Sequence, residues 1–480
     1  MRIAAIDQGT TSTRCLVLEE DGSFHVVHSR THRQIYPRQG WVEHDPLELL
    51  ANVQACIDAA GPVDALGIDN QGESCLAWDG QTGAPVSAVI VWQDRRTQAA
   101  ISRLQADGAQ ELTLRLAGLP LDPYFSAAKF AWMVENIPEA KALLAQGRLR
   151  LGTTDAFFIE RLSGHFCTDI TTASRTSLMN LRTGQWDEQL CALFGVPMEA
   201  LPEIRPSAGD FGIARTENTS VPLRAGIVDQ QASLHGHGCR KAGDAKITFG
   251  TGAFALAVSG ETPLMAPRQG LLPTIAWQKG ANPPVYALDG GVYSAASALN
   301  WARSLGLFDS FDEINSFDAE PAISRGLAFV PAFSGLGCPY WDGSAAGLWI
   351  GMSLDTTPAD MVQSILEGIA LRAAQVIAAM GACVDIRDTI SIDGGVSANP
   401  YFCQFLADVL QKGVIVHETA EQTALGTALM AAEGAGLEVP GGAQDKARTF
   451  EPAKTPASFM HTYEEAIARS RNWRSHEQGS

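Results

Sequence analysis

Two short turns rich in glycine and small hydroxyl residues occur at corresponding places in the two halves of this chain. One is Gly9-Thr10-Thr11-Ser12, and the other is Gly250-Thr251-Gly252. Each turn lies between two apolar runs, so its backbone N–H groups and hydroxyls converge on one place, as in an anion nest suited to phosphate oxygens. A single turn of this kind is usually an ordinary hairpin, but the repetition favours a pair of phosphate-binding turns.

Two charged residues beside the first turn fit the same chemistry. Arg14 is permanently charged and donates paired hydrogen bonds. Asp7 ends the preceding apolar run and cannot bind phosphate directly, but its carboxylate can hold a hydrated Mg²⁺ on the phosphates. A third turn, Gly394-Gly395, ends another apolar run and lets the backbone approach a ligand closely. No G-x-x-x-x-G-K-[ST] motif is present, which excludes the usual P-loop.

The composition restricts the partners and the compartment. The 480 residues carry a net charge of −18 at pH 7, which argues against binding to nucleic acids or anionic lipid surfaces. The 9 cysteines include no C-x-x-C pair, as expected of reduced thiols in a cytoplasmic protein. We see neither a leader pattern nor a run of about 18 apolar residues, so we expect no membrane insertion.

The apolar periodicity predicts an α/β fold that is built twice. In the first half we expect strands at 3–7, 13–18, 24–29, 63–69 and 86–91, and helices at 46–60, 94–106, 126–136 and 155–162. In the second half we expect strands at 245–249, 253–258, 285–289, 389–392 and 413–417, and helices at 294–304, 358–381, 399–411 and 423–433. The order predicts two similar domains, residues 1–243 and 244–480, facing a cleft with a hinge near 241–245.

Several longer stretches resemble the FGGY carbohydrate kinases, a family within the actin and hexokinase superfamily. The segments YFSAAKFAWMVEN (124–136) and GLWIGMSLDTTPADMVQSILE (347–367) fit that family's two signature patterns. The glycerol kinase branch is the most similar, through DQGTTSTR (7–14), VIVWQDRRT (89–97), TTASRTSL (171–178), GIVDQQASL (226–234) and TFGTGAF (248–254). The resemblance extends to about residue 436. It implies two actin-like, or ribonuclease H-like, domains flanking a catalytic cleft.

The resemblance implies transfer of the γ-phosphoryl group of ATP, with Mg²⁺, to a hydroxyl of a small polyol. Asp229, in GIVDQQ, would accept the proton of the attacking hydroxyl. An Asp at a helix start is more commonly an N-cap, and we expect the helix dipole and nearby N–H groups to keep this carboxylate ionised. The residues implied on the nucleotide are Thr10, Thr11, Ser12, Arg14 and Thr251 at the phosphates, and Asn300, Gly395 and Asn399 at the adenosine. The family has Gln where this chain has Asn300.

The same resemblance places the polyol against Glu73, Trp92, Tyr124, Asp229 and Phe254. Carboxylates and a phenol exchange hydrogen bonds with hydroxyls, and aromatic rings pack on C–H faces. The chain departs from the family in DNQGES (69–74), where Gly72 replaces an arginine that would donate to two substrate hydroxyls. We count Gly72 among the substrate-site positions.

Three functions are therefore open. The first is a kinase that converts glycerol to glycerol 3-phosphate, and the second is an FGGY kinase for another polyol or ketose, such as a tetritol or a pentulose, because of Gly72. The third is an actin-fold ATPase that acts as a chaperone or a filament subunit. The aromatic residues Trp92 and Tyr124 speak for a small-molecule pocket and against the third. We also expect a homo-oligomer, either a dimer or a tetramer.

Overall fold

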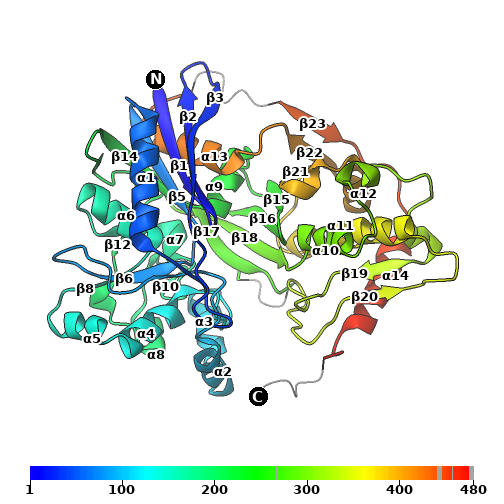
Figure 1. Cartoon of the computed structure of the whole chain (residues 1–480), viewed down its shortest axis with the longest axis horizontal. Coiled ribbons are helices and arrows are strands. Elements are labelled where there is room, and N and C mark those ends of the chain that lie inside the picture. The colour runs from blue at the N-terminus through cyan, green and yellow to red at the C-terminus, as the bar shows by residue number, and fades with distance from the viewer. Residues whose placement is uncertain (266–268, 440–445, 457, 475–480) are drawn as a thin grey trace.

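The chain folds into two lobes, one formed by the first half of the sequence and the other mostly by the second (Figure 1). This is a computed structural model, and it describes residues 1–265, 269–439, 446–456 and 458–474. Both lobes are built on a mixed β-sheet flanked by helices, as the sequence predicts.

The first sheet has the strand order β13-β14-β5-β1-β2-β3. Strands β1, β2 and β3 form the predicted antiparallel meander, and β5 and β14 run parallel to β1. The bounds are β1 (Arg2–Gln8), β2 (Ser12–Glu19), β3 (Phe24–Thr31), β5 (Ala65–Asn70), β13 (Ile213–Arg215) and β14 (Ser220–Val228).

The second sheet has the order β17-β18-β16-β15-β21-β22-β23. Its last six strands correspond to the six strands of the first sheet, with β15 in the place of β1 and with β21 and β22 parallel to it. The predicted duplication is therefore confirmed. The bounds are β15 (Ala245–Phe249), β16 (Ala253–Gly260), β17 (Leu272–Trp277), β18 (Val285–Val292), β21 (Thr389–Asp393), β22 (Gly413–His417) and β23 (Ala447–Phe450).

Smaller sheets and helices complete the first lobe. Four strands form a sheet in the order β4-β7-β6-β8. The expected strand 86–91 is found only in part, as β7. The strands of the small sheets are β4 (Glu43–His44), β6 (Cys75–Asp79), β7 (Val89–Ile90), β8 (Leu149–Thr153), β9 (Cys167–Asp169), β10 (Met179–Asn180), β11 (Gln185–Trp186) and β12 (Glu203–Arg205), with β19 (Ala328–Val330) and β20 (Leu348–Ile350) in the second lobe.

The first lobe has more helices than the sequence analysis predicts. Its helices are α1 (Pro46–Ala60), α2 (Gln98–Ala106), α3 (Gln110–Leu116), α4 (Ser126–Asn136), α5 (Pro138–Ala145), α6 (Thr154–Ser163), α7 (Ile170–Ala173), α8 (Glu188–Phe194) and α9 (Asp229–Gly236). Later helices are α10 (Ala296–Ser304), α11 (Pro358–Gly381), α12 (Pro400–Leu410), α13 (Gln422–Gly434) and α14 (Ser458–Ser470). The 3-10 turns among the described residues are η1 (Met198–Ala200), η3 (Phe311–Ile314), η4 (Ala322–Arg325) and η5 (Gly395–Ala398).

The two helices with the clearest start signals begin where the sequence predicts. Asp45 caps α1 by accepting hydrogen bonds from the N–H groups of Leu47 and Glu48, and Gly61 ends it. Thr357 and Asp360 form a capping box at the start of α11. By length and composition, helix α11 could cross a membrane. However, 83% of its most apolar window is buried within the protein, as expected of a core helix.

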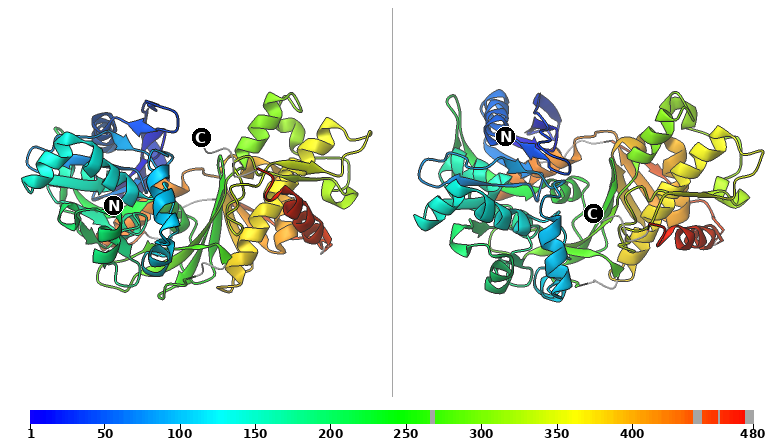
Figure 2. Two further views of the ribbon diagram at one scale, coloured as in Figure 1. Left: turned by 90° about the horizontal axis from the view of Figure 1, so that it is seen from below. Right: turned by 60° about the horizontal axis from the view of Figure 1, so that its bottom comes forward.

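Two helices cross at the contact between the lobes. Helix α13 comes late in the chain, yet it packs on β1, β5 and β14 of the first sheet as well as on α9 (Figures 1 and 2). The crossing is close because glycines face carbonyl groups: a Cβ at Gly426 would lie 1.8 Å from the carbonyl oxygen of Ala232, and one at Gly236 would lie 1.9 Å from that of Gln422. The apolar cluster around the crossing joins residues of both halves, including Ile3, Leu256 and Leu425.

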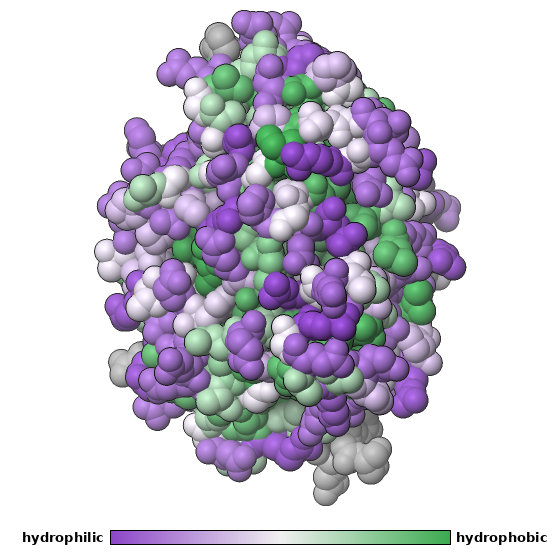
Figure 3. All heavy atoms as spheres, turned by 90° about the vertical axis from the view of Figure 1, so that its left-hand side faces the viewer, coloured by the Kyte–Doolittle hydropathy of each residue, from purple (hydrophilic) through white to green (hydrophobic). Residues whose placement is uncertain are grey.

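The outer face of the first lobe is mostly hydrophilic, with apolar residues scattered among polar ones (Figure 3). Each of the nine cysteines is free, and eight of them are buried. Small thiols therefore serve as packing in the core.

Candidate active site

The first phosphate turn is a rigid hairpin between β1 and β2. The Gly9 N–H donates to the Ser12 carbonyl oxygen at 3.0 Å, and the Thr10 carbonyl oxygen lies 2.8 Å from His32 Nε2 and 2.7 Å from Gln34 Nε2. The Thr11 side chain is exposed. The backbone of the turn is thus held by neighbouring side chains, while the Thr11 side chain remains exposed.

Arg14 extends from this hairpin toward the second half of the chain. Its Nη1 lies 3.3 Å from a carboxylate oxygen of Glu421, the residue before α13. The guanidinium is therefore partnered in the structure, and the assignment of Arg14 to the phosphates remains a prediction.

The second phosphate turn, Gly250-Thr251-Gly252, is tied to the start of α10. The Thr251 carbonyl oxygen accepts hydrogen bonds from the Ala295 N–H at 2.8 Å and the Ser297 hydroxyl at 2.9 Å. The Gly394 loop passes directly beside this hairpin, because Gly394 has φ +91° and a Cβ there would lie 2.3 Å from the Phe249 carbonyl oxygen. Two of the three predicted glycine turns are therefore neighbours.

The three predicted adenosine residues all belong to the second lobe. Asn300 is exposed on α10, and the space around the Gly395 Cα is open, with no atom within 4 Å of an added Cβ. Asn399 is the N-cap of α12: its Oδ1 accepts from the Phe402 N–H at 2.8 Å, and its Nδ2 donates to the Ile314 carbonyl oxygen at 2.7 Å. Its side chain holds the helix start in place, and a contact with adenosine stays a prediction.

Carboxyl groups gather where the parallel strands of the first sheet end. Asp7 on β1 and Asp69 on β5 are paired in register, and their side chains lie within hydrogen-bonding distance of each other. Burial raises the pKa of both, and for Asp69 the negative charge of Asp7 adds to the effect. The Thr427 hydroxyl donates to Asp69 Oδ2 at 2.7 Å, whereas Oδ1 is buried without a partner.

These carboxyl oxygens fit a Mg²⁺ ion. Mg²⁺ is usually bound by one or two protein carboxylates together with waters and substrate phosphates. Among the described residues, no group of three or more His, Cys, Asp or Glu side chains is arranged as a complete metal site. Asp7 therefore suits a metal held mainly by phosphate and water, and the Asp69 side chain lies next to it. The sequence analysis did not single out Asp69.

Asp229 lies at the point where β14 ends and α9 begins, next to the same strand ends. The expectation that the helix start keeps it ionised is wrong. Burial, together with the negative charges of Glu73 and Asp7, raises its pKa to about 7, although the Gln230 N–H and the Lys246 ammonium act in the opposite direction. An acid poised near neutral pH is well matched to proton transfer.

Three of the predicted polyol residues come together beside Asp229. Trp92 and Tyr124 meet edge to face, with ring centroids 5.7 Å apart. The Trp92 Nε1–H donates to the Thr10 hydroxyl at 3.1 Å, so the same indole contacts the first phosphate turn. The pKa of Tyr124 is raised well above its usual value by burial and by the negative charge of Glu73. The phenol is therefore neutral and able to donate a hydrogen bond.

Phe254 comes from the other lobe. It lies on β16 opposite Gly291 on β18, and its ring stands over the glycine, where an added Cβ would contact the ring edge at 3.7 Å. Asp289, two residues earlier on β18, forms an ion pair with Arg175. The sequence analysis quoted the segment that contains Arg175 but gave that residue no role, because its partners lie far away in the sequence.

Gly72 has a structural reason to be glycine. It occupies the turn between β5 and β6 with φ +70°, a conformation that side chains other than glycine adopt at a cost. The turn directs Glu73 into the buried site. The backbone conformation therefore favours glycine at position 72, independently of any contribution to substrate choice.

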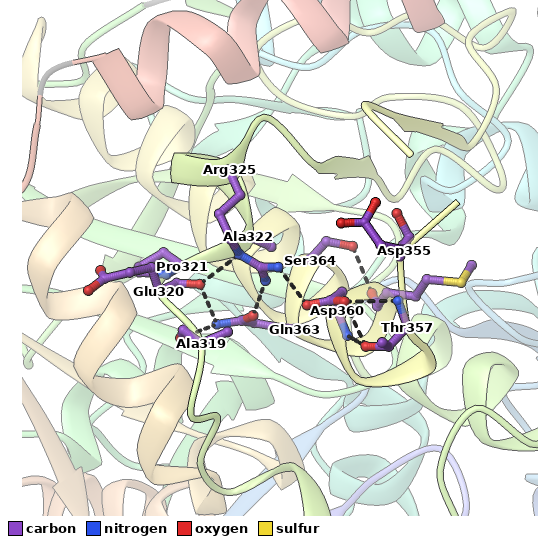
Figure 4. Close-up of polar contacts among 12 residues, drawn as sticks. Ala319, Glu320, Pro321, Ala322, Arg325, Asp355, Thr357, Asp360, Gln363 and Ser364 are labelled. Carbon is purple, nitrogen blue, oxygen red and sulfur yellow. Dashed lines mark hydrogen bonds and ion pairs between the residues drawn. The ribbon is translucent and has the colours of Figure 1, made fainter. Parts of the chain in front are cut away.

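Residues of the second signature segment (347–367) make structural contacts at the start of α11. In Figure 4 the guanidinium of Arg325 lies among residues of η4 and α11: its Nη1 lies 2.6 Å from Asp360 Oδ1, and its Nη2 donates to Gln363 Oε1 at 2.8 Å. Gln363 in turn donates to the Glu320 carbonyl oxygen at 3.3 Å. These contacts fix the start of the core helix.

Comparison with known proteins first places the fold in the class of two-domain α/β kinases. The structure of glycerol kinase from Plasmodium falciparum with ADP superimposes with a TM-score of 0.91 at 29% identity and 98% coverage of both chains. A ligand-bound xylulose kinase from Lactobacillus acidophilus shares the fold alone, with a TM-score of 0.84 at 21% identity over 98% of this chain and 96% of that one.

Comparison of the sequence identifies the family more specifically than comparison of the structure does. Residues 2–236 match the N-terminal domain, and residues 245–435 the C-terminal domain, of the FGGY family of carbohydrate kinases. A glycerol kinase from Rhizorhabdus wittichii is 40% identical over 494 residues, which cover 98% of this chain and 97% of that protein. The chain belongs to the FGGY family of carbohydrate kinases, and the fold predicted from the resemblance is confirmed.

Proposed function

We propose that this protein transfers the γ-phosphoryl group of ATP to a hydroxyl of a small polyol, and that the polyol is glycerol, giving glycerol 3-phosphate. The observation that carries the proposal is the position of Asp229. Its carboxyl group is close enough to Asp7, beside the first phosphate turn, and to Glu73, in the polyol site, for both charges to raise its pKa. The 40% identity to a glycerol kinase over nearly the whole chain supports glycerol as the polyol.

The residues would divide the reaction between them as follows. Asp229 accepts the proton of the attacking hydroxyl, whose oxygen forms the new bond to phosphorus while the bond to the departing ADP breaks. Glu73 and Tyr124 orient the polyol, and Thr10, Thr11, Ser12 and Thr251 contact the phosphates. A bound Mg²⁺ would neutralise phosphate charge as the transition state forms, and Asp7 is the residue suited to hold it.

Gly72 keeps a second substrate class open. An arginine donor is missing there, which would suit a longer polyol or a ketose, such as a tetritol or a pentulose. The carboxylates of Glu73, Asp229 and Asp289 around the site favour a neutral substrate over a sugar acid. The assignment to the FGGY carbohydrate kinases speaks against an actin-fold chaperone or filament subunit.

The experiment is a substrate screen that follows ADP release with glycerol, dihydroxyacetone, erythritol, xylitol and xylulose, each with and without Mg²⁺. We expect the highest kcat/KM with glycerol and a loss of turnover without the metal. A higher kcat/KM for a tetritol or a pentulose would replace glycerol with that substrate. ADP release that does not depend on any polyol would refute the proposed activity.

Three further properties are part of this proposal. We place the domain boundary at 243/244, the protein in the cytoplasm, and the active species as a homo-oligomer, either a dimer or a tetramer. Support for the boundary comes from the gap between the two matched family domains, residues 2–236 and 245–435. Size-exclusion chromatography with light scattering would measure the oligomer, and a single 51.1 kDa species would contradict it.

A further inference from the structure

Arg175 lies at the centre of the predicted polyol site and joins the two lobes. Its Nε donates to Glu73 Oε1 at 2.7 Å, and its Nη2 lies 3.2 Å from Asp289 Oδ2. Glu73 follows β5 of the first lobe, whereas Asp289 lies on β18 of the second. All three side chains are largely buried, with exposed fractions of 6% for Arg175, 4% for Glu73 and 14% for Asp289. A buried guanidinium between two carboxylates is held firmly in one orientation.

The third nitrogen of this guanidinium has no acceptor. Arg175 Nη1 is buried and makes no hydrogen bond to any described residue. A buried charged donor without a partner costs free energy, so proteins rarely keep one unless a ligand or a water completes it. The guanidinium lies near the rings of Tyr124 and Phe125, with its central carbon 5.9 Å and 5.6 Å from the two centroids. Nη1 is thus an unused donor among residues predicted to surround the polyol.

The neighbouring contacts keep Arg175 in this position. The Ser174 hydroxyl lies 3.0 Å from the Thr274 hydroxyl on β17, and the Gln231 amide donates to the same Thr274 hydroxyl at 3.1 Å. Thr274 therefore links the Arg175 segment to α9, the helix that Asp229 begins. Hydrogen bonds to one residue therefore connect the segment that carries the guanidinium with the helix that carries the proposed base.

We infer that Arg175 determines the choice of polyol: it fixes the Glu73 carboxylate as an acceptor and presents Nη1 as a donor to a substrate hydroxyl. This inference rests on the proposed function. It gives the site one acceptor and one donor side by side, which together match one hydroxyl or two neighbouring hydroxyls. It also provides a guanidinium in a site whose turn residue, Gly72, has none.

The test compares substrates that differ by one hydroxyl in wild type and in Arg175→Met. Glycerol, propane-1,2-diol and propane-1,3-diol all keep a primary hydroxyl, and each diol lacks one hydroxyl of glycerol. We expect Arg175→Met to lower kcat/KM for glycerol by about tenfold to a hundredfold, the range for one hydrogen bond to a charged group. For the diol that lacks the contacted hydroxyl, the loss should stay within about threefold. Calorimetric titration with glycerol alone should show the same weakening of binding.

A matched control separates substrate contact from stability. Arg96 is also a buried arginine, 2% exposed and ion-paired with Glu43 and Asp94, but its guanidinium lies over the rings of Trp41 and Trp132, which are not predicted to contact the polyol. Arg96→Met should lower the thermal midpoint and leave the ratio of glycerol to diol kcat/KM unchanged. Arg175→Lys keeps the charge without the planar fork. If Arg175→Met fails to fold, Arg175→Lys should still fold. It should shift the ratio of glycerol to diol kcat/KM in the same direction.

The outcomes distinguish the two claims. If wild type uses glycerol, and both Arg175 variants lower kcat/KM for all three substrates by the same factor or leave glycerol binding unchanged, the inference is wrong and the proposed function stands. If wild type releases no ADP with any polyol, the proposed function fails and the inference fails with it. A loss confined to substrates that carry one particular hydroxyl supports the inference and identifies the hydroxyl that Arg175 contacts.

Discussion

Replacing Asp229 by Asn should make the protein more stable and less active. The pKa of Asp229 rises from 3.8 to about 7 on folding, mainly through burial. At 1.36 kcal/mol per pKa unit, keeping this carboxylate ionised in the folded protein costs about 4 kcal/mol above pH 7. Asn is neutral, has the same shape and keeps an oxygen to accept from the Gln230 N–H, which now lies 2.6 Å from Oδ1. We therefore expect Asp229→Asn to gain about 2–4 kcal/mol in stability at pH 8.

The pH dependence identifies the cause. Between 3.8 and about 7 the folded protein binds the Asp229 proton more tightly than the unfolded chain does, so wild type loses stability as pH rises through this window. The gain from Asp229→Asn should therefore be largest above pH 7 and fade toward pH 4. Calorimetric melts of both proteins without nucleotide, from pH 4 to 8, measure it. A gain that is absent at pH 8, or equal at every pH, would refute the argument from burial.

The same variant tests catalysis. Removing a positioned base should lower turnover by at least about 10²-fold while ATP binding stays nearly intact. In wild type, kcat/KM should rise with pH through about 7 as Asp229 loses its proton. A near-normal kcat for Asp229→Asn would remove Asp229 from the role of base.

Three other outcomes are expected. Thr251→Val should raise the KM for ATP or lower kcat while the KM for glycerol stays the same; a change in the glycerol KM alone would mean that the two sides of the cleft are assigned the wrong way round. Small-angle scattering should show a smaller radius of gyration with glycerol plus a non-hydrolysable ATP analogue, and an unchanged radius would argue against a hinge near 241–245. Gly72→Ala and Gly72→Arg should each lower stability by about 1–2 kcal/mol because of the positive φ. A melt of either variant that matches wild type would show that the turn tolerates a side chain.

The sequence predicts the helix bounds and the hairpins that depend on short-range interactions. The bounds of α1 and α11 follow from Asp45, Pro46 and Thr357, because caps act within one helical turn. The two meanders follow from apolar runs separated by short polar turns. The small strands β6 and β8 and the helix α5 were missed, since they belong to an insertion held together by contacts between distant segments.

The site shows the same limit. The motifs indicated Glu73, Tyr124 and Asp229, but the pairing of Arg175 with Glu73 and Asp289 joins residues more than a hundred positions apart. The pKa of Asp229 depends on burial and on charges brought together by folding, and neither is visible in a local pattern. The resemblance identified residue types, and the structure adds their electrostatic state.

The crossing of α9 and α13 has a consequence for synthesis of the protein on the ribosome. Strand β14 completes the parallel part of the first sheet at Val228, but α13, which covers β1, β5 and β14, is not translated until Gly434. At about 5–20 residues per second, this interval lasts about 10–40 s. During that time an apolar sheet face in the nascent chain is without its covering helix. The first lobe cannot mature before most of the second has been made. A premature stop in the second half would therefore release a chain prone to aggregation, and a long pause would prolong the exposure of the sheet face.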